Sequence, residues 1–301
     1  MDIKYFNIDW ISNNDGPGKR LVLFLQKCHL ECAWCHSPHS QGECSPLLFF
    51  SGLCIKCGAC VDSCTSNVHT IINDVHQIER GLCLLCGDCI KACPSSNEEK
   101  GALVLPTKSV DVNILYKKLR PQLLMLKDIG GITISGGEPL LQAEAVKLLL
   151  KLCKQDDINT AIETSGIISV KNYKILSSLV DTWLLGFRLT TNEEKIDGKL
   201  LKIFSESLSY LSKLPNTQIL ARIPVIPNHN TFDEYYNKVL ELLNNNNIQN
   251  VDLLKYNAHT SHYYKAIGKD FNDKELIDLT NSKYENAKTY FLTNKITLYE
   301  N

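Results

Sequence analysis

The sequence of 301 residues contains no apolar run long enough to cross a membrane. Its start, MDIKYFNIDW, lacks the basic and then apolar regions of a secretory signal. It also lacks an excess of charge of either sign, because 32 Lys and Arg oppose 33 Asp and Glu. Such a balance disfavours nucleic acid or an anionic membrane as the main partner. We therefore expect a soluble, cytoplasmic protein with one large domain, or one domain and an insertion.

Cysteine is abundant instead. There are thirteen, and eleven of them fall in tight clusters between Cys28 and Cys93. A disulfide framework needs an oxidising compartment, and nothing in the sequence indicates one, so metal binding is the preferred interpretation. Cys44 and Cys153 match no motif: we expect Cys44 to be free and Cys153 to lie in the core, on an amphipathic helix.

The first cluster is FLQKCHLECAWCHSP, residues 24–38, where Cys28, Cys32 and Cys35 follow an apolar run that predicts a strand. A structural zinc site has four protein ligands, whereas a site that performs chemistry leaves one position open. An iron–sulfur cubane held by three thiolates has one iron free for a substrate or cofactor. The spacing thus favours an open iron at the C-terminal end of a strand, where barrel enzymes place their active sites.

An internal repeat occupies residues 45–100. GLCIKCGACVDSCTSN, residues 52–67, aligns with GLCLLCGDCIKACPSS, residues 81–96, at an offset of 29, with eight of sixteen positions identical. Each half has the spacing of bacterial ferredoxins, in which the fourth cysteine binds the other cluster. Two zinc sites are the alternative, but zinc motifs usually contribute ligands as separated pairs. We expect one cluster on Cys54, Cys57, Cys60 and Cys93, and a second on Cys83, Cys86, Cys89 and Cys64.

Beyond Pro106, strands and helices alternate about six times, which favours a parallel α/β sheet, either a barrel or doubly wound. Strands are predicted at 131–135 and 160–166, and in DTWLLGFRL, QILARIPVIP and VDLLKY. Helices are predicted at 109–129, bent or broken near Pro121, and at 141–154, 170–179, 195–213, 232–243 and 273–287. Residues 244–250 and 257–264 are expected to be loops.

The motif Gly136-Gly137-Glu138-Pro139 lies where one predicted strand ends and a helix begins. Two glycines permit close approach of a ligand or another backbone, and a neighbouring carboxylate can accept from an ammonium group. Alone, the motif is as well explained by an ordinary turn with a solvated Glu. Beside a three-cysteine loop on an earlier strand, it is much more informative.

Together, C-x3-C-x2-C and SGGEP resemble the radical SAM superfamily. More narrowly, DGPGKR, FLQKC, CAWCHSP, GGITISGGEPLLQ, ETSG and RIPVIP resemble the glycyl radical enzyme activating enzymes, of the pyruvate formate-lyase activating enzyme type with a ferredoxin-like insert. The resemblance runs from Asp15 to about His262. It implies a partial (β/α)6 barrel of the TIM type in residues 1–44 and 101–301, and an insert at 45–100 with two 4Fe-4S clusters.

The same resemblance implies three 4Fe-4S clusters in all and S-adenosylmethionine bound to the open iron of the Cys28, Cys32 and Cys35 cluster. Reductive cleavage would give a 5′-deoxyadenosyl radical under anaerobic conditions, and this radical would take the α-hydrogen of a glycine in a partner enzyme. The protein would position the sulfonium and exclude water. The implied SAM contacts are Gly136, Gly137 and Glu138 at the amino group, and Trp34, Cys35 and His36 at the adenine.

Two sites depart from the family pattern. Gly186 and Arg188 stand where members usually carry Asp-x-Lys, and Asn257 stands where they often carry His. Arg188 can still hold the SAM carboxylate, in a bidentate manner. Asn257 stays among the cofactor-binding candidates. His36, His259 and His262 are otherwise exposed loop residues, and Arg222 either faces the barrel interior or stabilises a strand end.

The implied partners are a glycyl radical enzyme as protein substrate and flavodoxin or ferredoxin as electron donor. The insert would relay electrons from that donor or, as the second possibility, dock the partner enzyme. Two other functions stay open: a radical SAM enzyme acting on another peptide or a small molecule, and an electron-transfer protein without SAM chemistry. The intact cysteines and GGEP count against the last.

Three cubanes contain about twelve irons per chain, which anaerobic iron analysis can measure. Replacing Cys28, Cys32 and Cys35 by Ala should remove about four of them. A wild-type value near eight would fit the repeat alone and would contradict an iron–sulfur cluster on the first three cysteines.

Overall fold

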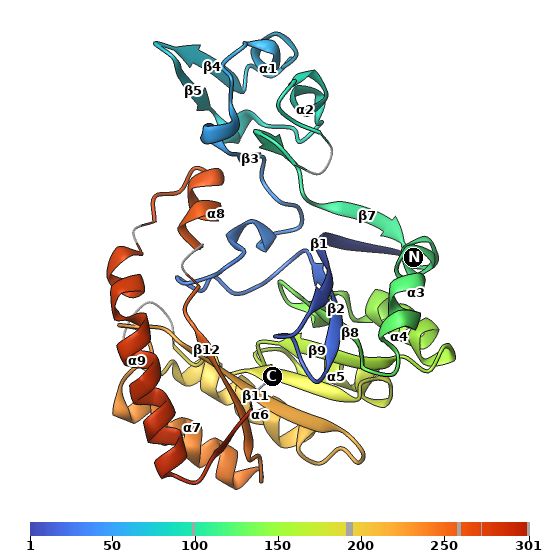
Figure 1. The fold of residues 1–301 in the computed structure, drawn as a ribbon, viewed down its shortest axis with the longest axis vertical. Coiled ribbons are helices and arrows are strands. Elements are labelled where there is room, and N and C mark those ends of the chain that lie inside the picture. Colours follow the sequence, from blue (N-terminus) through green and yellow to red (C-terminus); the bar gives the residue numbers. More distant parts are fainter. Residues whose placement is uncertain (98–99, 191–194, 258–259, 272, 300–301) are drawn as a thin grey trace.

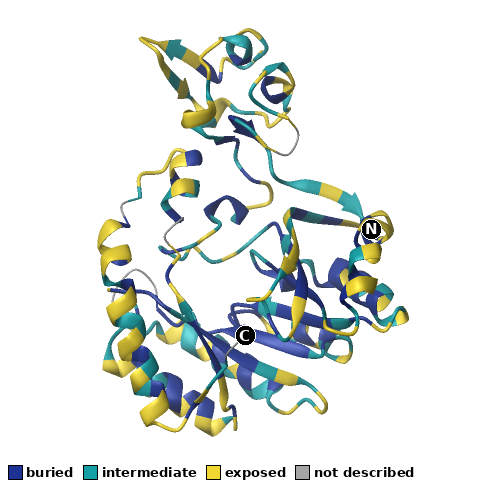
Figure 2. Cartoon of the chain, in the orientation of Figure 1, coloured by how far each residue is buried: buried dark blue, intermediate teal, exposed yellow. Residues whose placement is uncertain are grey.

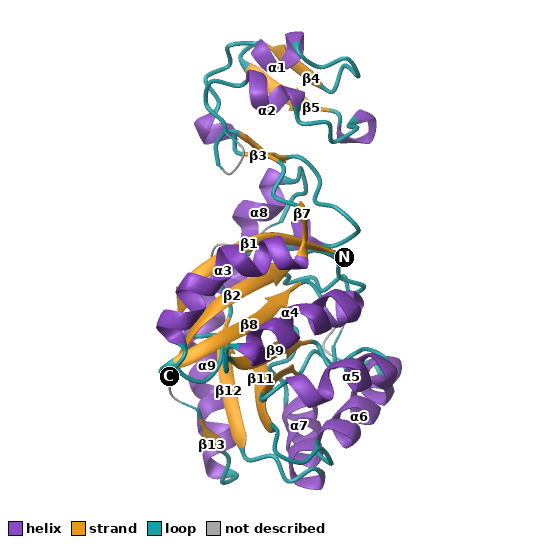
Figure 3. Cartoon of the chain, turned by 90° about the vertical axis from the view of Figure 1, so that its right-hand side faces the viewer, coloured by secondary structure: helices purple, strands orange, loops and turns teal. Residues whose placement is uncertain are grey.

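The computed structural model describes residues 1–97, 100–190, 195–257, 260–271 and 273–299. The described chain has two parts. The larger contains a nine-stranded mixed sheet with helices along its outer side, and the smaller lies beyond one end of it (Figures 1 and 3). Among the described residues, no helix combines the length and the apolar character needed to cross a membrane.

The large sheet has the order β13-β12-β11-β10-β9-β8-β2-β1-β7. Its strands from β2 to β13 run parallel, and β1 and β7 are antiparallel additions at the β2 edge. The bounds are β1 Asp2–Ser12, β2 Lys19–Leu25, β7 Lys108–Asp111, β8 Gly130–Gly136, β9 Asn159–Thr164, β10 Thr182–Gly186, β11 Gln218–Val225, β12 Asn250–Lys255 and β13 Thr297–Leu298. The predicted parallel sheet is thus confirmed, whereas the sequence did not predict β1.

Helices connect the parallel strands and cover the outer side of the sheet, as right-handed crossovers require. They are α3 Val112–Leu126, α4 Ala143–Gln155, α5 Val170–Leu176, α6 Gly198–Leu211, α7 Asp233–Asn245 and α9 Lys274–Thr293. The short helix α8 Thr260–Ala266 lies toward the smaller part instead (Figure 1). Three expectations were wrong in detail. The helix predicted at 109–129 begins only at Val112, because residues 109–111 pair with β1 as part of β7. The helix at Pro121 is not broken, because α3 continues through it, and part of the predicted loop 257–264 forms α8.

The main core fills the space between the sheet and these helices, and Figure 2 shows the strands as its buried layer. Trp183 on β10, Tyr173 on α5 and Phe204 on α6 are fully buried there. Each such side chain contributes on the order of 2 kcal/mol through burial. This core fixes the carboxyl ends of the parallel strands, where the predicted site residues lie.

The smaller part contains two two-stranded sheets and two short helices. Its elements are β3 Leu48–Phe49 with β6 Leu103–Val104, β4 His69–Ile72 with β5 Val75–Ile78, α1 Ala59–Asp62 and α2 Asp88–Ala92. The sequence repeat is also a backbone repeat: Gly58 and Gly87, 29 residues apart, precede α1 and α2 with φ values of 84° and 83°. A small core of its own holds this part together.

The two cysteines outside the clusters provide a test of the core. Cys153 on α4 is fully buried, whereas Cys44 is exposed. Cys153→Ser places a hydroxyl in an apolar core and should lower the free energy of unfolding by about 1–3 kcal/mol. Cys44→Ser should change it by less than about 0.5 kcal/mol. Anaerobic urea unfolding measures both, and equal losses would contradict the core position of Cys153.

Candidate active site

The three-cysteine loop begins directly after β2, and its backbone is held from several sides. Tyr264 on α8 donates to the carbonyl of Ala33 (3.2 Å), and the His29 ring contacts the carbonyl of Ile167 through Nε2 (2.6 Å). Tyr264 and Ile167 are both distant from the loop in the sequence. The conformation of the loop therefore depends on the folding of the larger part around it. The sequence did not predict the role of Tyr264, which it assigned to a loop.

The GGEP turn is joined to this loop through main-chain hydrogen bonds. Gly137 N–H donates to the Leu25 carbonyl and Glu138 N–H to the Lys27 carbonyl, both at 2.8 Å. A Cβ on Gly136 would lie 2.3 Å from the Leu25 nitrogen, and one on Gly137 would lie 2.2 Å from the Lys27 oxygen. Only glycine permits this approach. The structure therefore brings together the two motifs that the sequence paired.

Glu138 has a structural task that the sequence did not predict. Its carboxylate is fully buried and accepts from Thr164 Oγ1 (2.8 Å), from Ser165 N–H (2.9 Å) and from Ser165 Oγ (2.7 Å). It also caps its own turn, by accepting from Leu140 N–H at 3.3 Å. The side chain thus fixes the end of β9, the ETSG segment, to the GGEP turn.

The thiols of the loop are half-buried, and this burial changes their acidity. Desolvation raises the pKa of Cys28 to about 12 and that of Cys35 to about 11, and it also raises the pKa of Cys32. A metal that binds these sulfurs therefore has to displace their protons. Three sulfurs on one short loop fit a cluster with one iron left open, and fit a closed four-ligand zinc site less well.

Arg188 follows β10 and reaches the same thiols. Its positive charge offsets part of the rise that burial causes in the pKa of Cys32. Burial alone would lower the pKa of Arg188, but Cys32, Glu163, Cys35 and Cys28 raise it above the ordinary value. A Cβ on Gly186 would lie 3.3 Å from Arg188 Nε, so the small residue leaves room for the long one. Gly186 and Arg188, which together replace the usual Asp-x-Lys, are therefore coupled in space.

A second arginine, Arg222 on β11, is buried among carboxylates. It contacts Asp252 through Nε (3.1 Å), Glu163 through Nη1 (3.3 Å) and Asp15 through Nη1 (3.6 Å). Burial alone would raise the pKa of Glu163. The positive charges of Arg222 and Arg188 and a hydrogen bond from Ser135 Oγ outweigh this effect, so the pKa lies below its ordinary value. Of the two alternatives for Arg222, the structure shows the inward one.

The other predicted contacts lie around this centre in different environments. Trp34 is buried in a cluster with Ile226 and Tyr256. His36 is solvent-accessible but surrounded by protein groups, and desolvation together with the charge of Arg188 lowers its pKa to about 4. Asn257 is exposed, and its carbonyl accepts from Thr260 Oγ1 (2.8 Å) at the start of α8. His259 lies outside the described residues.

In the smaller part, the eight repeat cysteines line two cavities, four to each, and none of the thirteen cysteines, all of which are described, forms a disulfide. The first cavity contains Cys54, Cys57, Cys60 and Cys93, and the second contains Cys64, Cys83, Cys86 and Cys89. These are the crossed sets expected from the sequence. Four sulfurs around each cavity fit one cubane apiece.

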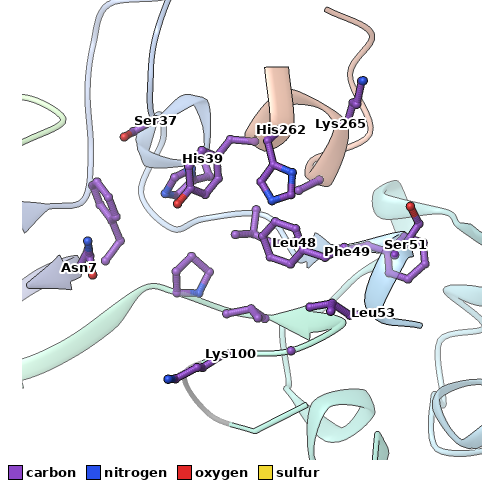
Figure 4. Close-up of a pocket in the computed structure, with 18 of the residues that line it drawn as sticks. Asn7, Ser37, His39, Leu48, Phe49, Ser51, Leu53, Lys100, His262 and Lys265 are labelled. Atoms are coloured by element: carbon purple, nitrogen blue, oxygen red, sulfur yellow. The ribbon is translucent and has the colours of Figure 1, made fainter. Parts of the chain in front are cut away.

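A pocket of about 1050 Å³ lies between the smaller part and the segment that follows the cysteine loop (Figure 4). Aromatic rings form much of its wall. The ring centroids of His39 and Phe6 are 4.8 Å apart, and the ring of His262 on α8 stacks on that of Phe50 with 4.9 Å between centroids. Arg80 donates to the Ala266 carbonyl (2.8 Å) and fastens the smaller part to α8. The sequence did not predict this pocket, because its lining comes from segments far apart in the chain.

This constellation has the form of a radical SAM enzyme: a three-cysteine loop after a parallel strand, a GGEP turn bonded to it, and a separate cysteine-rich part. Residues 53–97 match the family model of a 4Fe-4S dicluster domain. A solved domain of pyruvate-formate lyase-activating enzyme from Bacteroides vulgatus aligns with 56% of this chain and 98% of that chain, at 17% identity and a TM-score of 0.40. The family assignment rests on sequence relatives.

Two such relatives span nearly the whole chain. The trans-4-hydroxy-L-proline dehydratase activating enzyme of Clostridioides difficile is 32% identical over 298 residues, 97% of this chain and 96% of that protein. The choline trimethylamine-lyase activating enzyme of Oleidesulfovibrio alaskensis is 31% identical over 88% of this chain and 87% of that protein. The chain belongs to the glycyl radical enzyme activating enzymes. It therefore uses S-adenosylmethionine to activate a glycyl radical enzyme, as its sequence indicated.

The buried Arg222 network predicts a large effect on stability. Arg222→Leu leaves Asp15, Glu163 and Asp252 without their shared cation and should cost about 3–5 kcal/mol of unfolding free energy. The matched control is Arg120→Leu, which breaks an exposed pair with Asp156 and should cost much less, because solvent screens that pair. Anaerobic urea unfolding compares them. Similar losses would show that the network does not stabilise the fold.

Proposed function

We propose that Cys28, Cys32 and Cys35 hold the 4Fe-4S cluster at which this enzyme binds S-adenosylmethionine. When bound, such a cluster would supply the one electron needed to cleave SAM into methionine and the 5′-deoxyadenosyl radical, and would itself be oxidised. The observation that carries the assignment is the joining of the cysteine loop to the GGEP turn by two main-chain hydrogen bonds. The reactive atoms and the cofactor's amino group would therefore be held by one rigid backbone unit.

The surrounding residues then take distinct tasks. Arg188 would bind the SAM carboxylate, because its guanidinium already lies beside the thiols and stays charged. Gly136 and Gly137 would offer main-chain carbonyls to the amino group, since the Glu138 carboxylate is engaged by Thr164 and Ser165. Glu138 is then a positioning residue. Trp34 and His36 would border the adenine, and Asn257 would close the site from the end of β12.

The architecture proposed for this chemistry is a partial (β/α)6 barrel in residues 1–44 and 101–301, with an insert at 45–100. The insert would hold two more clusters, on the two crossed sets of four cysteines, which makes three in all. Its support is the grouping of these sulfurs around two separate cavities. The clusters would pass electrons from a flavodoxin or ferredoxin to the SAM-binding cluster.

The surface of the insert supports contact with a protein. Leu84 is 76% exposed and Ile55 is 64% exposed, and further large apolar side chains near the cysteines are exposed as well: Leu53, Ile72, Val75, Leu82 and Leu85. Apolar side chains gathered on so small a unit are typical of a docking surface. An electron donor that docks here would lie next to the insert clusters. Docking of the partner enzyme is the second possibility.

The decisive experiment adds reduced activating enzyme and SAM to a panel of glycyl radical enzymes without oxygen. The panel includes the dehydratase and the lyase named for the two relatives. A glycyl doublet in the electron paramagnetic resonance spectrum, with formation of 5′-deoxyadenosine, is expected for one member. If 5′-deoxyadenosine forms but no member gains a radical, the panel lacks the partner or the substrate is of another class. Adding a cell extract from the source organism separates these two outcomes.

Arg188 gives a sharper test of the proposed site. Arg188→Ala should lower the rate of 5′-deoxyadenosine formation about 10–100-fold, since groups that orient a metal-bound ligand typically have effects of this size. Arg188→Lys keeps the charge and should lose less. Arg120→Ala is the matched control on the surface. An unchanged Michaelis constant for SAM in Arg188→Ala would remove Arg188 from the binding site.

A further inference from the structure

The two cavities of the insert have the same cysteines but different walls. The offset of 29 relates Cys54 to Cys83 and Gly58 to Gly87, and it relates His76 to Leu105. His76 on β5 lines the first cavity, and Leu105 lines the second. At this equivalent position, the imidazole of His76 lies beside one set of sulfurs, and the hydrocarbon side chain of Leu105 lies beside the other.

The His76 ring is held in place by four neighbours. Its Nδ1 lies 3.5 Å from Cys54 Sγ, and its Nε2 lies 3.0 Å from Nδ1 of His69 on β4 and 3.8 Å from Cys60 Sγ. Phe49 packs on the ring edge-to-face, at 4.5 Å between centroids. His69 is itself buried and also lines the second cavity. The histidine pair therefore lies between the two sets of cysteines.

Iron ligation by the cysteines determines which ring nitrogen of His76 donates a hydrogen bond. A thiolate bound to iron has no proton and can only accept, so the 3.5 Å contact needs the proton on His76 Nδ1. His76 Nε2 is then the acceptor, and His69 Nδ1–H must donate to it. His69 thereby fixes both the tautomer and the orientation of His76. In the second cavity, Cys64 accepts from the main-chain N–H of Val68 (3.4 Å), a bond that side-chain substitutions leave in place.

We infer that His76, oriented by His69, is a hydrogen-bond donor to the sulfur of the Cys54–Cys57–Cys60–Cys93 cluster and gives it a higher reduction potential than the other insert cluster. This inference rests on the proposed binding of two clusters in the insert. Hydrogen bonds to cluster sulfurs stabilise the reduced form, because they withdraw electron density from it. Leu105 offers no such bond. The pair of clusters would accordingly direct electrons toward the first one.

The same side chains could be taken for a small cation site, since ligand atoms of Cys60, His69 and His76 lie within 4.8 Å of one another. Cys60 belongs to the first set of four sulfurs, however, and a sulfur shared with a second ion would leave the cubane short of a ligand. In the hydrogen-bonding assignment, His76 Nε2 accepts from His69 at 3.0 Å, and the longer contact of 3.8 Å with Cys60 Sγ carries no proton. Metal analysis separates the two assignments.

The experiment uses the full chain with Cys28, Cys32 and Cys35 replaced by Ala, so that only the insert clusters contribute to the spectrum. Midpoint potentials are measured by an anaerobic redox titration followed by electron paramagnetic resonance. His76→Leu should make one midpoint more negative and leave the other in place. Leu105→His should make the other midpoint more positive. His76→Asn, which retains an N–H near the Nδ1 position, should stay close to the parent.

Unchanged midpoints in His76→Leu, with iron fully loaded, would overturn the inference. Zinc bound in the parent and lost in His76→Leu would also overturn it, in favour of the cation site. If the parent binds far fewer than about eight irons, the proposed insert clusters fail instead. Should Leu105→His not fold, the comparison of His76→Leu with His76→Asn decides alone. A purely structural role for His76 would alter stability in both and the midpoint in neither.

Discussion

Two main-chain hydrogen bonds between the GGEP turn and the residues after β2 hold the site of this enzyme together. They require glycine at 136 and 137, because any Cβ there would collide with the backbone that carries Cys28. Glu138 extends the same joint to β9 through its buried carboxylate. Three strand ends are therefore joined, and the cysteine loop is held relative to the sheet, with Leu30 of the loop packed against the main core.

Acidic groups face both arginines around this joint. Arg222 contacts Asp15, Glu163 and Asp252, whereas Arg188 lies near the cysteine thiols and Glu163. Under the proposed function, Arg188 would therefore keep binding capacity for the carboxylate of SAM, and Arg222 would not.

Much of this could be predicted from the sequence, because it depends on local spacing. The cysteine sets, the GGEP turn and the alternating strands are short patterns, and the structure brings their residues together as expected. What the sequence did not provide depends on distant pairing. The pairing of β1 with β7, the bond from Tyr264 to the cysteine loop and the Arg222 network join segments far apart in the chain. α8 was missed because its seven residues, TSHYYKA, are too few to show a helical pattern.

The crossed sets of cysteines have a consequence for how the insert assembles. Cys93 closes the cavity of the first half and Cys64 that of the second, so neither half contains a complete ligand set. A chain that contained only one of the two repeats would keep three of the four sulfurs for its cubane. Maturation of the insert is therefore expected to be cooperative, with each half serving as a template for its twin. Duplication has here produced two interdependent sites from one motif, and has made the loss of either one a loss of both.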